Sequence, residues 1–386
     1  MPLTPKLRSK WGAAPWQRPL SFAVASTALP PTAPDVAIVG GGLTGVSAAY
    51  HLAKIGIRAV LFEAGLLADG ASGRTGGLVL EGTAVGILDS VDTCVPGLNR
   101  VVDEIGIDCD LALPGCWEIE HRKAKPSRML PWSDDGRPVS VARTVSGGVV
   151  QPAALTLGIA QAAARLGAII REHSPVTRIN LGPELSLEVG GQRVNPGHVV
   201  VGANAWINAI LADTPPLHSS LTFACVTEPL DDATLAAIGL DQGVPFYTKD
   251  LPYLWGRTIR DGRVIFGAGL IFGEAPDLEE TDVREGDSAA VLDRLQKRVR
   301  GLHPALREIR FDAAWAGPIA FAKDSIPLLG PYPANPRVLV SGGYAGHGVA
   351  LSVRAGELLA LAIGENRPLP KWGALSGRES ENVGGR

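Results

Sequence analysis

The sequence has few cysteines, and they are widely separated. The 386 residues contain four of them, and no two form a C-x-x-C pair; they are Cys94, Cys109, Cys116 and Cys225. This pattern excludes a zinc ribbon and a disulfide-rich scaffold, and we expect no bound metal. Few and distant cysteines suit a reducing compartment, so we expect a cytoplasmic protein.

Long apolar runs and dense basic runs are also missing. Glycine, proline and charged residues interrupt every apolar stretch before it reaches the roughly 18 residues that a membrane-spanning helix needs. Lysine and arginine number 36 against 39 aspartate and glutamate residues, which gives a net charge of −3 without a basic cluster. We therefore expect neither a membrane span nor a nucleic-acid partner, and a small molecule is the expected ligand.

The residues that are present are typical of a folded, turn-rich chain. Hydrophobic residues make up 46% of the sequence and charged residues 19%, with 47 glycines and 30 prolines. This composition excludes a disordered chain and a coiled coil. The length predicts two or three structural units, and the expected fold class is α/β or α+β.

One segment has the pattern of a βαβ unit. Residues 36–39 predict a buried strand, residues 43–55 a helix that Gly56 ends, and residues 57–62 a second strand of a parallel sheet. The turn between the first strand and the helix matches G-x-G-x-x-G; it reads Gly40-Gly41-Gly42-Leu43-Thr44-Gly45. A strand before this pattern and a helix after it are the context in which it indicates a dinucleotide site.

Each part of that site has a physical role. Gly40 allows the tight turn, Gly42 leaves room for a pyrophosphate at the helix N-terminus, and Gly45 lets helix and strand pack closely. Glu63, followed by Ala64, ends the second strand, where a carboxylate accepts hydrogen bonds from ribose hydroxyls and disfavours NADP. A glycine-rich turn that serves only strand-to-helix packing is the alternative interpretation.

The rest of the chain alternates between segments typical of a parallel α/β sheet and segments typical of an antiparallel sheet. Residues 151–167 predict a helix, and the short strands after it continue the first sheet or cap it with a small meander. In contrast, Asp261-Gly262 between β-rich arms predicts a hairpin of an antiparallel domain. We therefore predict an α/β fold, with a Rossmann-like nucleotide-binding domain and an interleaved antiparallel-sheet substrate domain (α+β). The predicted boundaries are 1–34 for an N-terminal arm, 35–80, 145–215 and 325–370 for the nucleotide-binding domain, 81–144 and 216–324 for the substrate domain, and 371–386 for a C-terminal tail.

Five segments carry a resemblance to a known family. They are residues 35–80 with the loop Ala71 to Gly77, the block at 151–180, and the stretches 198–206, 315–330 and 342–352. Over nearly the whole chain they resemble the D-amino acid oxidase family of FAD-dependent amine and amino-acid oxidoreductases. The Ser72 to Gly77 form and the Trp11-Gly12 and Pro15-Trp16 pairs look most like the gamma-glutamylputrescine oxidase-like branch.

The resemblance implies FAD, held non-covalently because no cysteine lies near the flavin motifs. It implies that residues 71–77 pass the pyrophosphate and the flavin edge, that Val176 lies at the adenine, and that residues 203–206 cross the phosphates. The last helix would point at the flavin pyrimidine, where its dipole favours the reduced anion. The expected cofactor-binding residues are Gly40, Gly42, Leu43, Thr44, Gly45, Glu63, Ala64, Ser72, Arg74, Thr75, Gly76, Gly77, Val176, Ala203, Asn204, Trp206, Gly343, Tyr344, Gly346, His347, Gly348 and Val349.

The resemblance also implies a reaction. In this family the carbon beside an amine nitrogen delivers hydride to flavin N5, and water hydrolyses the resulting imine. The expected function is thus oxidation of the C–N bond of an amine or amino-acid derivative, with oxygen or another electron acceptor. A dehydrogenase that passes electrons elsewhere, an NAD-dependent dehydrogenase on the same βαβ unit and a non-catalytic FAD-binding subunit are the alternatives.

Two residues are candidates for a catalytic role. His347 lies in the Gly-rich turn before the last helix, and its alternative role is a hydrogen bond at the flavin edge without proton transfer. Tyr253 alternates with Trp255 in the predicted hairpin, so the pair is expected on one face of the sheet as an aromatic wall for a cationic amine. Ordinary core packing is the alternative for both aromatic residues.

The sequence departs from the family at one position. Amino-acid oxidases of this family place an arginine shortly after W-x-G to hold the substrate carboxylate, whereas residues 315–317 here are followed by Pro-Ile-Ala-Phe. The expected substrate is therefore an amine without an α-carboxylate, or one whose carboxylate is held elsewhere by Arg257 or Lys323. Tyr247, Lys249 and Arg257 lie in the same region, and the charged residues among them are interpreted as part of a solvated face.

Overall fold

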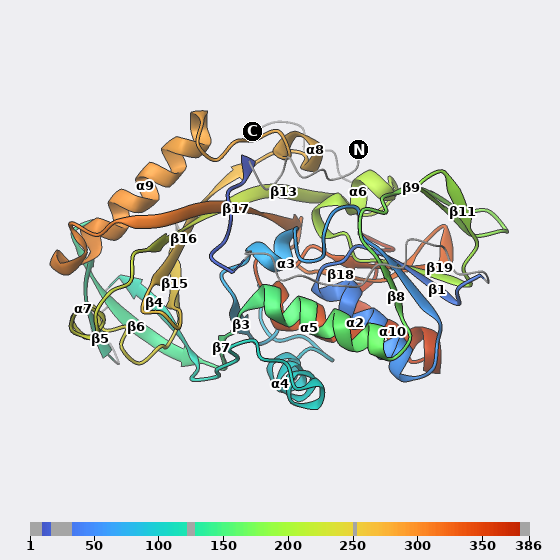
Figure 1. Cartoon of the computed structure of the whole chain (residues 1–386), viewed down its shortest axis with the longest axis horizontal. Coiled ribbons are helices and arrows are strands. Elements are labelled where there is room, and N and C mark those ends of the chain that lie inside the picture. The colour runs from blue at the N-terminus through green and yellow to red at the C-terminus, as the bar shows by residue number, and fades with distance from the viewer. Residues whose placement is uncertain (1–9, 17–32, 122–127, 250–252, 379–386) are drawn as a thin grey trace.

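The computed structural model describes residues 10–16, 33–121, 128–249 and 253–378, and its mixed α/β fold is built on two large sheets (Figure 1). The predicted fold class is therefore confirmed. The predicted arm at 1–34 is described over residues 10–16 and 33–34, and the predicted tail at 371–386 over residues 371–378. The remainder of both segments lies outside the described residues.

The predicted βαβ unit forms the centre of a six-stranded sheet. Every residue of the first two strands, β1 and β2, is buried, as expected for parallel strands covered on both faces. Five strands pair in parallel, and β18 joins the edge antiparallel to β19. In order across the sheet the strands are β18 (Leu328–Tyr332), β19 (Asn335–Gly342), β12 (His198–Val201), β1 (Val36–Val39), β2 (Ala59–Phe62) and β8 (Ile169–Arg171).

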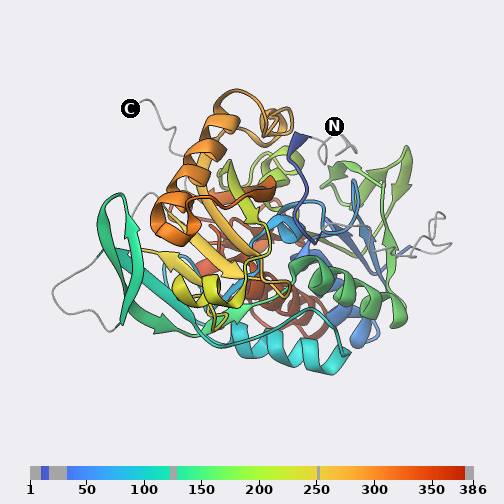
Figure 2. The same ribbon diagram turned by 60° about the vertical axis from the view of Figure 1, so that its left-hand side comes forward.

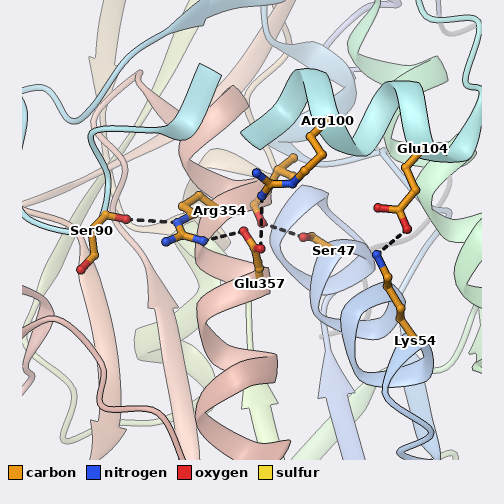
Figure 3. A network of polar contacts seen from close by, with 8 residues as sticks. Ser47, Lys54, Ser90, Arg100, Glu104, Arg354 and Glu357 are labelled. Carbon is orange, nitrogen blue, oxygen red and sulfur yellow. Dashed lines mark hydrogen bonds and ion pairs between the residues drawn. The ribbon is translucent and has the colours of Figure 1, made fainter. Parts of the chain in front are cut away.

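Helices cover one face of this sheet (Figure 1). They are α2 (Leu43–Lys54), α5 (Pro152–Arg165) and α10 (Gly348–Glu365), with α4 (Cys94–Ile105) packed outside them. Helices α2 and α10 pack closely because Gly356 has no side chain: a Cβ there would lie 2.6 Å from the Cβ of Ser47. Polar side chains join α2, α4 and α10 around this contact (Figure 3).

A small meander covers the opposite face. It consists of β9 (Val176–Asn180), β10 (Ser186–Val189) and β11 (Gln192–Val194), which pack together with η1 (Asn204–Trp206) and α6 (Ile207–Ile210) against the alternate residues of β1 and β2. The second block of the chain therefore does both things that its sequence allowed. It supplies β8 and β12 to the parallel sheet and caps that sheet with the meander.

The second sheet has eight strands, all antiparallel to their neighbours except the parallel pair β14 and β4. The predicted hairpin is confirmed as β15 and β16, with Gly262 in the left-handed region at φ +79°. In order across the sheet the strands are β17 (Phe311–Ala322), β13 (Leu217–Thr227), β16 (Val264–Phe272), β15 (Trp255–Thr258), β14 (Phe246–Thr248), β4 (Cys116–His121), β6 (Arg137–Val145) and β5 (Arg128–Asp134).

Helix α9 (Gly286–Leu302) packs on the outer face of the eight-stranded sheet through Val291, Leu295 and Val299 (Figure 2). The sequence predicts this helix over 288–299 with the same three residues inward. Shorter elements near this sheet are α7 (Asp232–Ala237), α8 (Ala275–Leu278) and η2 (Pro304–Leu306). No helix in the described ranges is long and apolar enough to cross a membrane.

The chain passes between the two sheets several times. It leaves the parallel sheet after β2, builds β4 to β6, returns through α5 and β8, builds β13 to β17, and comes back for β18, β19 and α10. A two-stranded ribbon of β3 (Leu78–Leu80) and β7 (Gly147–Val149) stands at the first crossing, after the single turn of α3 (Ala71–Arg74). The last element is η3 (Lys371–Gly373).

Residues 10–16 tie the two parts together. The Trp11 ring is fully buried, its Nε1 donates to the carbonyl of Leu278 at 2.9 Å, and its own carbonyl accepts from the Ala316 N–H at 2.8 Å. Trp16 donates through Nε1 to the carbonyl of Gly73 in α3 at 2.8 Å. This segment therefore contacts α3 on one side and α8 and β17 on the other.

Candidate functional site

A cavity of about 1700 Å³ lies where the two sheets meet. Its floor comes from the glycine-rich turn after β1, the end of β2, the segment around α3 and the N-terminus of α10. Its other wall is the inner face of the eight-stranded sheet, including residues of β17, β13, β16, β15, β14, β4 and β6. One continuous space therefore joins the predicted nucleotide site to the antiparallel sheet.

The glycine-rich turn has the geometry that close approach of a phosphate requires. Gly40 adopts φ +107°, which only glycine adopts readily, and a Cβ on Gly45 would lie 1.9 Å from the Gly40 carbonyl oxygen. Gly42 is the N-cap residue of α2 and provides no side-chain cap. The N–H of Leu43 donates to the Ser72 hydroxyl at 2.9 Å, and the N-terminus of α2 faces the cavity with the end of its dipole that favours an anion.

Glu63 is buried at the end of β2 and lines the cavity. Its Oε2 accepts from the Gly41 N–H at 2.7 Å and its Oε1 from the Gly65 N–H at 2.8 Å. Burial raises the pKa of this carboxyl, and the two N–H bonds oppose the rise. A carboxylate oxygen can accept more than one hydrogen bond, so Glu63 keeps acceptor capacity for ribose hydroxyls.

The turn before α10 forms the opposite end of the floor. His347 is the N-cap residue of α10, lines the cavity, and makes no side-chain cap to the helix. Its Nδ1 lies 3.4 Å from the carbonyl oxygen of Ala345, and burial lowers the pKa of the imidazole. A neutral His347 beside an uncapped helix N-terminus leaves that positive dipole end open to the cavity.

Arg74, an expected cofactor-binding residue, lines the cavity and makes its hydrogen bonds with the protein backbone. Its guanidinium donates to the carbonyls of Asp69, Gly12 and Ala316, and stacks 5.5 Å from the Trp11 ring. It lies at the cavity wall, yet its donors serve the backbone that joins α3 to the N-terminal segment. Arg74 therefore stabilises the wall of the cavity, and a role of its charge toward a phosphate stays a prediction.

Tyr344 lines the cavity, and its hydroxyl is bonded within the protein. Its hydroxyl is 2.7 Å from the Thr44 hydroxyl and 2.9 Å from the Ser341 hydroxyl, which ties α2 to the end of β19. Asn204 plays a similar part, because its Oδ1 accepts from the Gly343 N–H at 2.9 Å. The polar groups of these residues therefore stabilise the floor of the cavity through hydrogen bonds within the protein.

Three expected cofactor residues lie behind the wall instead of in it. Gly45, Gly77 and Gly343 do not line the cavity; a Cβ on Gly77 would lie 2.2 Å from the Val150 carbonyl oxygen, and one on Gly343 would lie 2.8 Å from Leu217. Their role is close backbone packing. The expected residues that do line the cavity are Gly40, Gly42, Leu43, Thr44, Glu63, Ala64, Ser72, Arg74, Thr75, Gly76, Val176, Ala203, Asn204, Trp206, Tyr344, Gly346, His347, Gly348 and Val349.

Of the two residues of the predicted aromatic wall, Trp255 lies where it was expected and Tyr253 does not. Trp255 lines the cavity, and its ring packs over Gly76, where a Cβ would lie 2.1 Å from Trp255 Cζ3. Tyr253 also lines the cavity, but it precedes β15, so the alternation along one strand does not apply to it, and it is 51% exposed. Tyr253 is therefore a rim residue of the cavity.

Neither cation suggested as a carboxylate anchor lines the cavity. Arg257 is buried and donates to the Val150 carbonyl at 2.8 Å, with its guanidinium 5.5 Å from the Trp16 ring. Burial lowers the pKa of Arg257 to about 10. Lys323 is exposed outside the cavity. Neither residue is placed to hold a carboxylate in the cavity: Arg257 turns toward backbone carbonyls, which its strand pattern does not reveal, and Lys323 follows the end of β17.

Sequence reasoning missed a charged group on the inner face of the antiparallel sheet. Glu118 on β4 and Arg143 on β6 line the cavity together with Tyr247 and Lys249. Lys249 is exposed, as its interpretation as part of a solvated face requires, and it also lines the cavity. No motif marks these positions, since Glu118 and Tyr247 become neighbours only through the pairing of β4 with β14, 129 residues apart.

The residues present at the floor of the cavity fit an extended dinucleotide. The turn at Gly40 to Gly42 and the N-terminus of α2, which faces the cavity, suit a pyrophosphate, and Glu63 suits the ribose of an adenosine. The uncapped N-terminus of α10 faces the same space from the far end. Two helix N-termini and one buried carboxylate are therefore arranged along one continuous groove.

Comparison with known proteins agrees with this geometry. The chain is 26% identical to "Probable oxidoreductase OrdL" of Haemophilus influenzae, over 85% of this chain and 82% of that protein. It is also 26% identical to the gamma-glutamylputrescine oxidoreductase of Escherichia coli, over 84% of this chain and 82% of that protein. The fold is similar to that of glycine oxidase from Geobacillus kaustophilus, with a TM-score of 0.70 and 20% identity over 90% of this chain and 99% of that one.

A family description matches most of the chain directly. The match runs from residue 35 to residue 362, and thus covers the glycine-rich turn, both sheets and nearly all of α10. It excludes the NAD-dependent alternative, because the family is defined by FAD. The chain belongs to the DAO family of FAD-dependent oxidoreductases.

Proposed function

We propose that this enzyme oxidises the C–N bond of a small-molecule amine or amino-acid derivative. The observation that carries the proposal is the continuous cavity, because it places an open sheet face directly above the residues that fit the dinucleotide. FAD, when bound, supplies the chemistry by accepting a hydride from the carbon beside the amine nitrogen. Two relatives support the reaction class, since one is a gamma-glutamylputrescine oxidoreductase and another a glycine oxidase.

The residues of this chain then have positioning roles. The ring of Trp255 over Gly76 forms an apolar wall between the segment after α3 and the sheet, against which a substrate carbon is oriented. His347, kept neutral by burial, is a hydrogen-bond partner at the α10 end of the cavity. Tyr253 on the rim contacts the substrate where it enters.

We also propose that the FAD is bound non-covalently. The four cysteines all lie in the described part of the chain, none lines the cavity, and all are buried. Burial raises the pKa of Cys94 and Cys116 to about 12, so neither is a ready thiolate. Their free thiols also support a cytoplasmic location.

The test is the visible spectrum of the purified protein without oxygen, before and after addition of a panel of amines and amino acids. We expect an oxidised flavin spectrum that acid precipitation releases into the supernatant and that at least one amine bleaches. Readmission of air then separates oxygen from another electron acceptor. A flavin that no compound on the panel bleaches would instead favour a non-catalytic FAD-binding subunit.

A further inference from the structure

A row of paired side chains crosses the inner face of the eight-stranded sheet. The strand register pairs Trp255 with Tyr247, Tyr247 with Glu118, and Glu118 with Arg143, so these four residues stand side by side on four adjacent strands. All four line the cavity, and Lys249 lines it beside them. The row begins at the wall over Gly76 and ends at a cation.

The polar end of this row is internally bonded. Oε2 of Glu118 accepts from a terminal nitrogen of Arg143 at 2.8 Å and from the Tyr247 hydroxyl at 3.1 Å. The Glu118 side chain is only 7% exposed, whereas that of Arg143 is 66% exposed. The carboxylate therefore fixes the direction of the guanidinium, and several of the five guanidinium N–H donors remain for a ligand.

The charges at this end favour an anion. Arg143 and Lys249 carry two positive charges and Glu118 one negative charge, so the group has a net charge of +1. The charge of Glu118 is already balanced by Arg143, and both of its bonds go to Oε2, so a cationic ligand meets one paired carboxylate and two cations here. A carboxylate ligand, in contrast, meets an oriented guanidinium whose planar donors match its two oxygens.

The distance along the row sets a minimum length for a substrate that contacts both of its ends. Adjacent strands are about 4.8 Å apart, so the three steps from Trp255 to Arg143 span roughly 14 Å between backbones. An α-amino acid has its carboxylate on the same carbon as its amine and is too short to reach from one end to the other. A chain of several bonds between the two groups is needed.

We propose that Arg143, oriented by Glu118 and assisted by Lys249, anchors a carboxylate at the far end of an elongated amine substrate. This inference rests on the proposed function for the position of the reacting amine, which is taken to lie at the Trp255 wall. It gives the substrate class as amines that carry a remote carboxylate. It also supplies an anchor in place of the arginine that is missing after Trp315-Ala316-Gly317.

The first experiment measures binding alone. Hexanoate, hexanamide and hexylammonium are titrated into the full-length FAD-loaded protein by calorimetry. We expect hexanoate to bind the wild type at least tenfold more tightly than hexanamide, and Arg143→Gln to remove that difference. Arg137→Gln is the matched control, because Arg137 lies on the same strand, is exposed and does not line the cavity.

A second variant distinguishes loss of the anchor from misfolding of the protein. Arg143→Gln leaves the buried Glu118 with one partner fewer, so the double variant Arg143→Gln with Glu118→Gln removes both charges together. We expect the double variant to retain FAD and to bind hexanoate as weakly as the single variant. Equal binding of hexanoate by Arg143→Gln and Arg137→Gln would overturn the proposal, as would preferential binding of hexylammonium that Glu118→Gln abolishes.

The second experiment separates this inference from the proposed function. Anaerobic flavin reduction is compared for 6-aminohexanoate, hexylamine and glycine. We expect 6-aminohexanoate to reduce the flavin with a kcat/KM at least tenfold above that of hexylamine, and Arg143→Gln to abolish this preference. If amines reduce the flavin without any preference for the carboxylate, the proposed function stands and the anchor is refuted. If no amine reduces the flavin, the proposed function fails and the binding titration still decides the anchor.

Discussion

Glu63 is the residue most important for the structure of the nucleotide end of the cavity. It is buried, it accepts from the N–H groups of Gly41 and Gly65, and it lines the cavity at the end of β2. Its two bonds hold the glycine-rich turn and the chain after β2 in a fixed relation. The same oxygens are the expected acceptors for ribose hydroxyls. One carboxylate therefore both stabilises the turn and is expected to bind the ligand.

Substitution Glu63→Gln is therefore expected to weaken FAD binding by about tenfold to a hundredfold, since charged acceptors form the stronger hydrogen bonds. The measurement is titration of FAD onto the apoprotein, followed by flavin fluorescence. Melting of the apoprotein reports any loss of the turn separately. The matched control is Glu184→Gln, an 86% exposed side chain outside the cavity, and equal FAD affinity in both variants would contradict the assignment.

Glu63 could be predicted from the sequence, whereas the Arg143 anchor could not. The position of Glu63 follows from local order, because a strand, a glycine-rich turn, a helix and a second strand bring it to the turn by chain connectivity alone. The pair of Glu118 and Arg143 depends on cross-strand register, and its neighbour Tyr247 comes from a strand 129 residues later. Arg257 shows the same limit, because its burial against carbonyls depends on tertiary packing.

At the scale of elements, the packing of α2, α4 and α10 surrounds a buried imidazole. Figure 3 shows the polar contacts between these helices, in which Glu357 of α10 bonds Arg354 and Arg100, and Glu104 of α4 pairs with Lys54 of α2. His51 of α2 lies among these charges, and its Nε2 is buried without a hydrogen-bond partner among the described residues.

Burial lowers the pKa of His51 to about 4, although Glu357 and Glu104 oppose the shift and Lys54 and Arg100 add to it. Between pH 6.5 and about 4 the unfolded chain therefore binds a proton at this residue that the folded chain does not. We expect acidification through this window to lower the free energy of unfolding of the wild type, by up to about 3 kcal/mol, relative to His51→Asn.

The measurement is urea unfolding of both proteins at half-unit steps from pH 7.5 to pH 4. His218→Asn serves as the control, because His218 is exposed on β13. The His51 contribution is contradicted if the difference between wild type and His51→Asn stays constant over the whole range.

Elements were easier to predict than their exact ends. The strand predicted over 57–62 begins at Ala59. The N–H of Ile57 still donates to the carbonyl of Leu52 in α2, and the Arg58 carbonyl accepts from the N–H groups of Asp35 and Val36 at the start of β1. β15 likewise begins at Trp255 and leaves Tyr253 outside. Hydrophobic periodicity gives the type of an element, while its ends depend on which backbone groups find partners in other segments.

At the scale of the whole molecule, residues 10–16 join the two sheets. Trp11 makes hydrogen bonds with Leu278 of α8 and with Ala316 of β17, and the Gly12 carbonyl accepts from Arg74. Trp16 donates to the Gly73 carbonyl in α3, and its ring centroid lies 6.0 Å from that of Trp315. The cavity lies between the parts that this segment connects. The segment therefore helps to fix the width of the site without lining it.

We expect Trp11→Ala to destabilise the protein by about 3–5 kcal/mol, because it removes a fully buried indole and its bond to Leu278. We also expect faster loss of FAD on dilution, since Arg74 loses the ring on which it stacks. Urea unfolding and flavin release by fluorescence measure the two effects. The control is Trp372→Ala in η3, a less buried tryptophan that bonds the Asp89 carbonyl, and an equal effect there would contradict a special role for Trp11.

The order in which the chain supplies its strands also bears on biosynthesis. β1 emerges early, but its neighbour β12 is made about 160 residues later, and β19 and α10 come later still. At translation speeds of about 5–20 residues per second, β1 waits on the order of 10–30 s for its second partner. The cofactor floor is complete only when α10 has left the ribosome, so we expect FAD to be loaded after residue 365 has been made, and a nascent chain arrested before residue 348 should retain none.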